Sequence, residues 1–207
     1  MNHFVLLALA ATLGTWFVTA LGAATVAFFK SPNQKALNLM LGFASGVMIA
    51  ASFWSLLQPA IERAETASTL PAYVVATTGF LLGALFMWGS DKIVSFARKN
   101  ADSIQNQNRE RLNRIIMLVL SITLHNIPEG MAVGLSFALA AQHAGEGAAL
   151  SGALALALGI GIQNFPEGAA ISLPLRQEGC SRSRAFLLGT LSGSVEPPSM
   201  TNWAPVR

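Results

Sequence analysis

Two short, similar stretches of the chain place an imidazole or amide side chain and a carboxylate in the middle of apolar segments. They are residues 124–130 (LHNIPEG) and 162–168 (IQNFPEG). In each, a nitrogen-bearing side chain lies four residues before a glutamate, and a proline directly precedes that glutamate. Residues four apart lie on one face of a helix, about one turn from each other. His125 with Glu129, and Gln163 with Glu167, are therefore predicted to form two pairs of ligands.

The composition around these stretches predicts a membrane protein. The chain of 207 residues is 53% hydrophobic and 11% charged, against roughly 25% charged for a typical soluble domain. Such a chain has too little polar surface to cover a soluble globule, so we expect an all-α, polytopic helical membrane protein in a lipid bilayer. Its basic residues lie in loops and form no stripe, so nucleic acid is not expected as a partner.

The apolar segments predict five full transmembrane helices and the start of a sixth. The five are expected at about residues 4–29, 36–58, 72–88, 115–141 and 148–175, and the sixth begins near residue 185. A mixed-charge connection is expected from Pro59 onward, and a basic cytoplasmic loop over residues 91–114. The whole chain, 1–207, is predicted to be a single transmembrane domain with an atypical tail at 198–207.

Glycines four residues apart occur on two of these segments. Gly42 and Gly46 lie on the second segment, and Gly79 and Gly83 lie on the third. Small residues at this spacing let a neighbouring helix approach closely in a membrane. Close helix packing is therefore expected on both segments, as it is at Gly130.

The loops predict the orientation of the chain. Those after the first, third and fifth segments hold two, six and three Lys or Arg residues, and those after the second and fourth hold one and none. Because basic loops stay in the cytoplasm, the N-terminus is expected outside a cell (inner) membrane. The fourth and fifth helices are then antiparallel, with both motifs near the bilayer midplane. Related motifs on oppositely directed, proline-interrupted helices indicate a transporter site.

The two acids have no counter-charge in the sequence around them. No Lys or Arg lies between Arg114 and Arg176. A charged carboxylate at the midplane costs on the order of 3 kcal/mol, and Glu129 and Glu167 would also repel each other. They must be protonated or share a bound cation, and a divalent ion would remove both penalties. The alternative, polar residues that only hydrogen-bond between helices, is disfavoured by the duplication.

The side-chain types indicate which ions would fit. Histidine, carboxylate and amide oxygen suit zinc, iron(II), manganese or cadmium. The absence of thiolates argues against copper(I), and the histidine argues against a dedicated magnesium or calcium site. Asn126 and Asn164 are rotated around the helix and could reach a second, adjacent point. The prolines also leave the carbonyls of Leu124 and Ile162 without a helical partner.

The motifs resemble those of the ZIP family of divalent-metal transporters. Residues 125–130 (HNIPEG) and 163–170 (QNFPEGAA) carry the resemblance most specifically. Residues 42–48 (GFASGVM) and 52–57 (SFWSLL) look like the bacterial branch, and residues 192–197 (SGSVEP) resemble the start of the sixth-helix motif. The resemblance covers the chain from the first segment to Pro197.

The resemblance implies a binuclear metal site between the fourth, fifth and sixth helices, with Glu167 bridging two positions. Carried over residue by residue, one position would be formed by His125, Glu129, Gln163 and Glu167, and the other by Asn126, Asn164, Glu167 and Glu196. Zinc would be a transported substrate rather than a cofactor. Family members move such ions into the cytoplasm, many as homodimers, by a rocking or elevator-like movement.

The sequence departs from the family pattern at two points, so alternatives to a transporter are also considered. Position 163 is Gln where many relatives have His, which weakens nitrogen ligation. The family usually has eight helices, so a C-terminally truncated product is expected, and a non-transporting, metal-binding membrane fragment is the main alternative. An intramembrane metal-dependent hydrolase is a weaker one, because the HExxH arrangement is absent. No GxxxxGK[ST] loop supports an ATP-driven pump.

Overall fold

A computed structural model describes residues 3–29, 34–101, 107–143 and 147–203, and in these ranges the regular structure is helical. The elements in chain order are α1 (His3–Ala24), η1 (Thr25–Ala27), α2 (Gln34–Ala51), η2 (Ser52–Leu57), α3 (Gln58–Ala67), α4 (Ala72–Ala101), α5 (Gln107–Gln142), α6 (Gly147–Gln177), α7 (Arg182–Ser192), η3 (Gly193–Val195), α8 (Glu196–Ser199) and η4 (Met200–Trp203). The predicted all-α class is confirmed.

Five stretches of the described chain are long and apolar enough to cross a membrane. They are His3–Ala27, Leu41–Thr66, Ala72–Ser90, Ile115–Gln142 and Gly147–Gln177. Each matches one of the five predicted segments, which confirms a polytopic helical membrane protein. The sixth predicted segment corresponds to α7 and the short helical turns that follow it.

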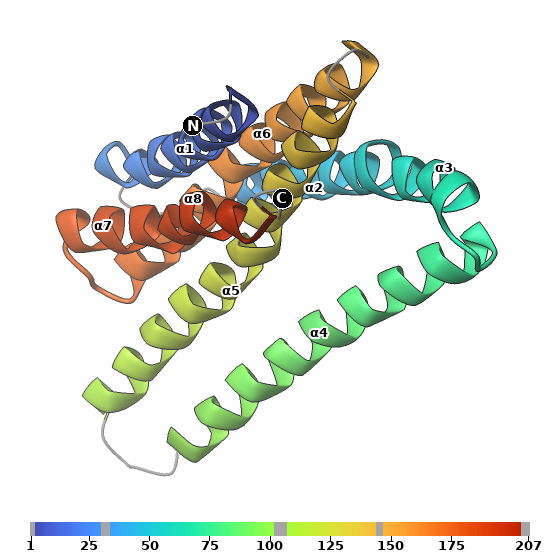
Figure 1. Ribbon diagram of the computed structural model, residues 1–207. Coiled ribbons are helices and arrows are strands. Elements are labelled where there is room, and N and C mark those ends of the chain that lie inside the picture. The colour runs from blue at the N-terminus through green and yellow to red at the C-terminus, as the bar shows by residue number, and fades with distance from the viewer. Residues whose placement is uncertain (1–2, 30–33, 102–106, 144–146, 204–207) are drawn as a thin grey trace.

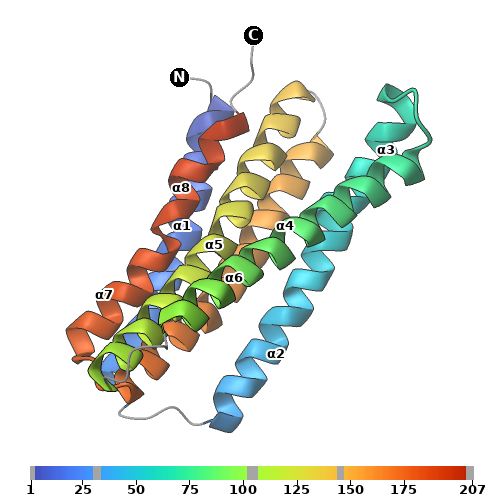
Figure 2. The same ribbon diagram turned by 90° about the horizontal axis from the view of Figure 1, so that it is seen from below.

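The helices form a central bundle with a peripheral part beside it. The central bundle consists of α1, α5, α6, α7 and α8, which contact one another. The peripheral part consists of α2, α3 and α4. Of these, α2 packs along α6, whereas Figures 1 and 2 show α4 diverging from α5 toward α3. Of the five spans, the one on α6 is the most buried inside the structure, whereas the apolar windows of the second and third spans bury no residue.

Glycines set the closest approaches within the bundle. A Cβ atom at Gly168 of α6 would collide with the backbone carbonyl oxygen of Thr19 on α1. A Cβ at Gly130 of α5 would likewise collide with the carbonyl oxygen of Glu196. Only glycine permits this proximity of backbones, as expected for packed membrane helices.

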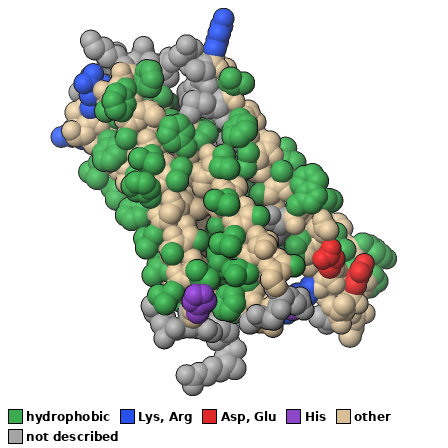
Figure 3. All heavy atoms as spheres, turned by 90° about the horizontal axis from the view of Figure 1, so that it is seen from above, with side chains coloured by type: hydrophobic (Ala, Val, Ile, Leu, Met, Phe, Trp, Pro, Cys, Tyr) green, Lys and Arg blue, Asp and Glu red, His purple; other side chains and the backbone are tan. Residues whose placement is uncertain are grey.

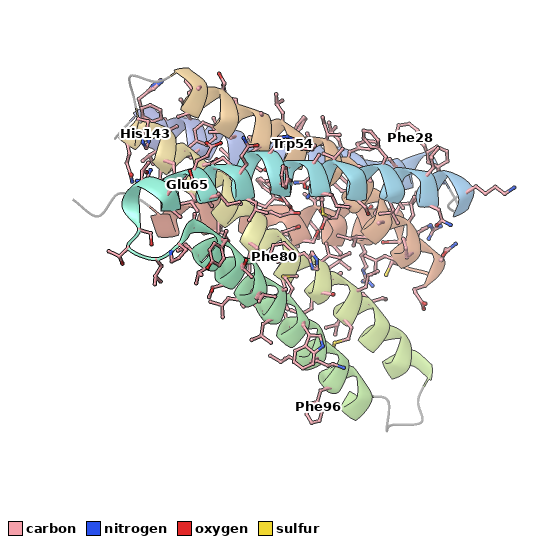
Figure 4. The ribbon with its side chains drawn as sticks, turned by 90° about the vertical axis from the view of Figure 1, so that its right-hand side faces the viewer. Phe28, Trp54, Glu65, Phe80, Phe96 and His143 are labelled. Carbon is pink, nitrogen blue, oxygen red and sulfur yellow. The ribbon has the colours of Figure 1, made fainter. Side chains whose placement is uncertain are left out.

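The face of the molecule that Figure 3 shows has the charge distribution of a membrane protein. Figure 3 shows a largely apolar surface with acidic and basic side chains toward its two ends. Figure 4 places Phe28 and Phe96 at one end of the molecule, and Glu65 and His143 at the other. Successive spans therefore alternate in direction, which agrees with the predicted antiparallel arrangement of the two motif helices.

The predicted end of the second helix at Pro59 is wrong. The chain passes from α2 through the π-helix η2 directly into α3, which ends at Ala67. At the end of η2, the N–H of Gln58 bonds to the carbonyl of Phe53, five residues back. Proline has no N–H and normally interrupts the i to i−4 ladder. The wider π turn changes the ladder just before the proline, so the helix continues.

The predicted loop over residues 91–114 is mostly helical. The helix α4 continues to Ala101 and α5 begins at Gln107, so both extend beyond their apolar spans. Lys, Arg, Gln and Ala are good helix formers, and a polar composition does not by itself end a helix. Residues 102–106 lie outside the described residues, and the cytoplasmic location of this connection stays a prediction.

The first residues of the predicted atypical tail belong to the bundle. Ser199 and Met200 are buried, and Met200 packs in a core cluster with Ala8, Val133 and Phe137. Residues 204–207 lie outside the described residues. The short turns after Glu196 therefore contribute to the packing between α1 and α5.

Candidate metal-binding site

The structure brings most of the predicted ligands together inside the central bundle. Asn126 and Glu129 come from α5, and the first residue of α8 is Glu196. Three further residues come from α6: Gln163, Asn164 and Glu167. The four most buried are Asn126, Gln163, Asn164 and Glu196, while Glu129 and Glu167 are half-buried.

A hydrogen bond joins the two sequence motifs directly. The side-chain amide Nε2 of Gln163 on α6 donates to Oε1 of Glu129 on α5. Both helices run without a break through their prolines, Pro128 and Pro166, which keeps each motif on a single helix face. The amide of one motif and the carboxylate of the other therefore meet.

A second hydrogen-bonded group links α6, α8 and α1. The Nδ2 of Asn164 donates to Oε1 of Glu196 (2.9 Å) and to the backbone oxygen of Thr15 (3.2 Å). The hydroxyl of Thr15 donates to the other carboxylate oxygen of Glu196, Oε2, at 2.5 Å. Both carboxylate oxygens of Glu196 are thus held by donors from neighbouring helices.

Thr15 was not among the site residues predicted from the sequence. A signal was present, because Thr12, Thr15 and Thr19 recur at helical spacing on the otherwise apolar first segment, and all three are buried. Threonine can also satisfy its hydroxyl on its own helix, as Thr12 does on the carbonyl of Ala8. The spacing alone therefore did not distinguish a site residue from ordinary helix packing.

Three buried oxygens of the site have no hydrogen-bond partner. They are Oδ1 of Asn126, Oδ1 of Asn164 and Oε2 of Glu129. The amide nitrogen of each asparagine is engaged, since Asn126 donates to the backbone oxygen of Ser192 at 3.0 Å and Asn164 donates as described above. Leaving a buried acceptor without a partner costs about 1–3 kcal/mol. A bound cation would remove that cost, and the oxygens suit one.

The three acids of the site would repel one another if all of them were ionised. Glu129, Glu167 and Glu196 lie close enough for unfavourable Coulomb interactions between their carboxylates. Within the described ranges, however, no three His, Cys, Asp or Glu side chains gather as a ready-made metal site. Amide oxygens of the described residues, such as those of Asn126 and Asn164, are further oxygen atoms that could complete a ligand set.

The structure does not place His125 with the buried residues. Its side chain is exposed, although its neighbour Asn126 is fully buried. No hydrogen bond to the His125 side chain occurs in the part of the chain that the structure describes. Its grouping with Glu129, Gln163 and Glu167 therefore stays a prediction.

The sequence matches a known family along most of its length. The family model described as ZIP Zinc transporter matches residues 3–114 and 97–201. The second match ends a few residues beyond Pro197, so it includes the first part of the tail that was expected to be atypical.

Individual relatives show the same relationship. The chain is 40% identical over 263 residues to the zinc transporter ZIP11 of Xenopus tropicalis, covering 93% of this chain and 78% of the relative. It is 37% identical over 193 residues to the zinc transporter GufA of Myxococcus xanthus (91% and 72%). It is 36% identical over 199 residues to the zinc transporter ZupT of Chlorobium luteolum (92% and 71%).

These names agree with the predicted resemblance, including its bacterial branch, and all of them denote transporters rather than enzymes. The family match covers the central bundle with both glutamate motifs as well as the peripheral helices. The chain therefore belongs to the ZIP zinc transporter family.

Proposed function

We propose that this protein moves zinc, and related divalent ions, across a membrane into the cytoplasm through the site between α1, α5, α6 and α8. The observation that carries this proposal is the group of three buried oxygens without partners, on Asn126, Asn164 and Glu129. Family membership supports zinc as the substrate. The ion is cargo, so it enters and leaves the site rather than residing there.

The amide donors explain how the acids are held between transport events. In this conformation Gln163 donates to Glu129, and Asn164 donates to Glu196. Partial positive charge on the amide N–H groups offsets the negative carboxylates where Lys and Arg are absent. An arriving divalent ion supplies the charge instead, and rotation of the Gln163 amide would then turn its oxygen toward the ion.

We propose two adjacent ion positions. One would use His125, Glu129, Gln163 and Glu167, and the other Asn126, Asn164, Glu167 and Glu196, with Glu167 common to both. The second position has stronger support, because the unpartnered oxygens of both asparagines belong to it. The first requires His125 to turn inward from its exposed position.

The proposed direction follows from the loops. The basic connections after the first, third and fifth spans would face the cytoplasm of a cell membrane, with the N-terminus outside. The opposite placement of Phe96 and His143 supports alternating spans (Figure 4). We also propose a homodimer, as the family resemblance implies.

Binding and flux measured on one sample test the function. The purified chain is reconstituted into liposomes, and equilibrium zinc binding and zinc uptake are both recorded. We expect both activities in the native protein and neither in Glu167→Ala. Glu65→Ala is the matched control, because Glu65 is an exposed acid at the far end of α3.

Measuring binding and uptake together distinguishes a transporter from the main alternative, a membrane protein that binds metal without transporting it. Zinc binding that is lost in Glu167→Ala, without uptake by the native protein, would identify a non-transporting metal-binding protein. Absence of binding in the native protein, or equal effects of Glu167→Ala and Glu65→Ala, would refute the proposed site itself.

A further inference from the structure

We propose that Thr15 of α1 is a positioning residue that sets the geometry of Glu196 and Asn164 for the ion. This inference rests on the proposed function, because it concerns ligands of the second ion position. It adds a first-helix residue to a site otherwise built from α5, α6 and α8.

Thr15 contacts both ligands through different atoms. Its side-chain hydroxyl donates to Oε2 of Glu196 at 2.5 Å, and its backbone oxygen accepts from Nδ2 of Asn164 at 3.2 Å. Asn164 in turn donates to Oε1 of Glu196 at 2.9 Å. The three residues form a closed group, so displacing one of them disturbs the other two.

The contact with the backbone fixes which end of the Asn164 amide faces the ion. The oxygens of Thr15 and Glu196 both accept from Nδ2, so the amide nitrogen must point toward α1 and α8. The amide oxygen Oδ1 then points elsewhere, and it is buried without a partner. Thr15 therefore helps to orient the amide oxygen of Asn164 toward the ion position, although Thr15 is not itself a proposed ligand.

The Thr15 hydroxyl restrains the Glu196 carboxylate but leaves it lone pairs with which to coordinate a cation. A hydroxyl has one proton, and of its two acceptors the Glu196 oxygen at 2.5 Å is closer than the Thr12 oxygen at 3.0 Å. Each carboxylate oxygen has two lone pairs, so Oε2 could keep this bond while Glu196 coordinates a cation. Hydrogen bonds of this kind orient metal ligands, and their loss typically weakens metal affinity about 10–100-fold.

The surroundings hold Thr15 in place. Its side chain is buried, with 3% of its surface exposed. The indole of Trp16, the next residue, donates to the backbone oxygen of Thr190 at 2.8 Å and ties α1 to α7. A Cβ at Gly193 would lie 3.3 Å from Oε1 of Glu196, so glycine at that position leaves room for the carboxylate beside α1.

Thr12 provides a matched control one turn away. It is also fully buried on α1, but its hydroxyl bonds only within its own helix, to the carbonyls of Ala8 (3.0 Å) and Leu9 (3.2 Å). Replacing either threonine by valine exchanges the same atoms in a buried helix position. The two variants differ in whether a bond to Glu196 is lost.

Zinc affinity and uptake kinetics of the full chain test the proposal. We expect Thr15→Val to weaken zinc binding, and to raise the KM for uptake, by about tenfold or more. The maximal rate per folded protein should change much less, because Glu196 and Asn164 remain present. Thr15→Ser keeps the hydroxyl and should restore affinity to near the native value, and Thr12→Val should match the native protein.

Several results would overturn the proposal. Native affinity in Thr15→Val, no recovery in Thr15→Ser, or an equal loss in Thr12→Val would each do so. If Thr15→Val cannot be purified folded, Thr15→Ala must show the same loss of affinity. Failure of both to fold, while Thr12→Val folds, would assign Thr15 to stability instead. Absence of zinc binding in the native protein would refute the proposed function, whereas binding that is insensitive to Thr15→Val would refute only this inference.

Discussion

Glycines four residues apart occur in both parts of the molecule, but they have different surroundings. In the central bundle, Cβ atoms at Gly130 and Gly134 of α5 would collide with the backbone oxygens of Glu196 and Met200. In the peripheral part, Cβ atoms at Gly42 and Gly46 of α2, or at Gly79 and Gly83 of α4, would meet nothing within 4 Å. The close packing expected for the peripheral glycines is therefore not found in the described structure.

Polar side chains differ between the two parts in the same way. In the bundle, Asn126 and Asn164 bond to other helices. In the peripheral part, the hydroxyls of Ser45 and Ser90 bond to carbonyls of their own helices. The exposed Arg63 of α3 does reach another helix, because it donates to Oε1 of Gln142 at the end of α5 at 2.6 Å. Glycine spacing permits close approach but does not by itself produce it. At Gly130 the close approach is accompanied by buried polar bonds between helices, and at Gly42 and Gly46 neither is found in the described structure.

The largest expected effect comes from adding a methyl group to a bundle glycine. Gly168→Ala places a Cβ against the backbone of Thr19 and Ala23, which cannot move aside like a flexible side chain. We expect a loss of about 2 kcal/mol or more of stability, seen as a lower thermal midpoint in detergent. Gly46→Ala is the control and should be neutral or slightly stabilising, because alanine favours a helix. Equal destabilisation by both variants would contradict the distinction between the two parts.

The next effect concerns the oxygen donors of the site. Asn126→Ala removes an unpartnered buried oxygen and the bond to the Ser192 backbone. We expect zinc affinity to fall about tenfold, in the range typical for disturbed metal sites. The matched change in the peripheral part is Ser45→Ala, which removes an exposed hydroxyl bonded only to its own helix. Titration with zinc checks both, and unchanged affinity in Asn126→Ala would remove Asn126 from the ion position.

Much of the fold was predictable because a bilayer requires long apolar helices. The five spans follow from apolar length. The facing of the two motifs follows from their places on adjacent antiparallel segments, and the grouping of Glu129 with Gln163 was implied by the family resemblance. The helix past Pro59 was missed because a proline usually ends a helix, and only the π turn of η2 accommodates it. The hydrogen bond of Thr15 to Glu196 was missed because it depends on how α8 packs against α1. A local sequence pattern does not predict a contact between segments so far apart in the chain.

The smallest effects should come from the prolines, and they again separate the two parts. Pro166→Ala restores a backbone N–H that can bond to the carbonyl of Ile162, beside Gln163 and Asn164. We expect zinc uptake to fall several-fold because the added bond would stiffen the turn that carries Gln163 and Asn164, while the protein remains folded. Pro59→Ala restores an N–H on the peripheral helix, and we expect a stability change within about 0.5 kcal/mol and unchanged uptake. Uptake per folded protein measures both. If Pro59→Ala reduced zinc uptake as much as Pro166→Ala does, the peripheral helix would contribute to transport as much as the turn at Pro166. The two parts of the molecule would then not be functionally distinct.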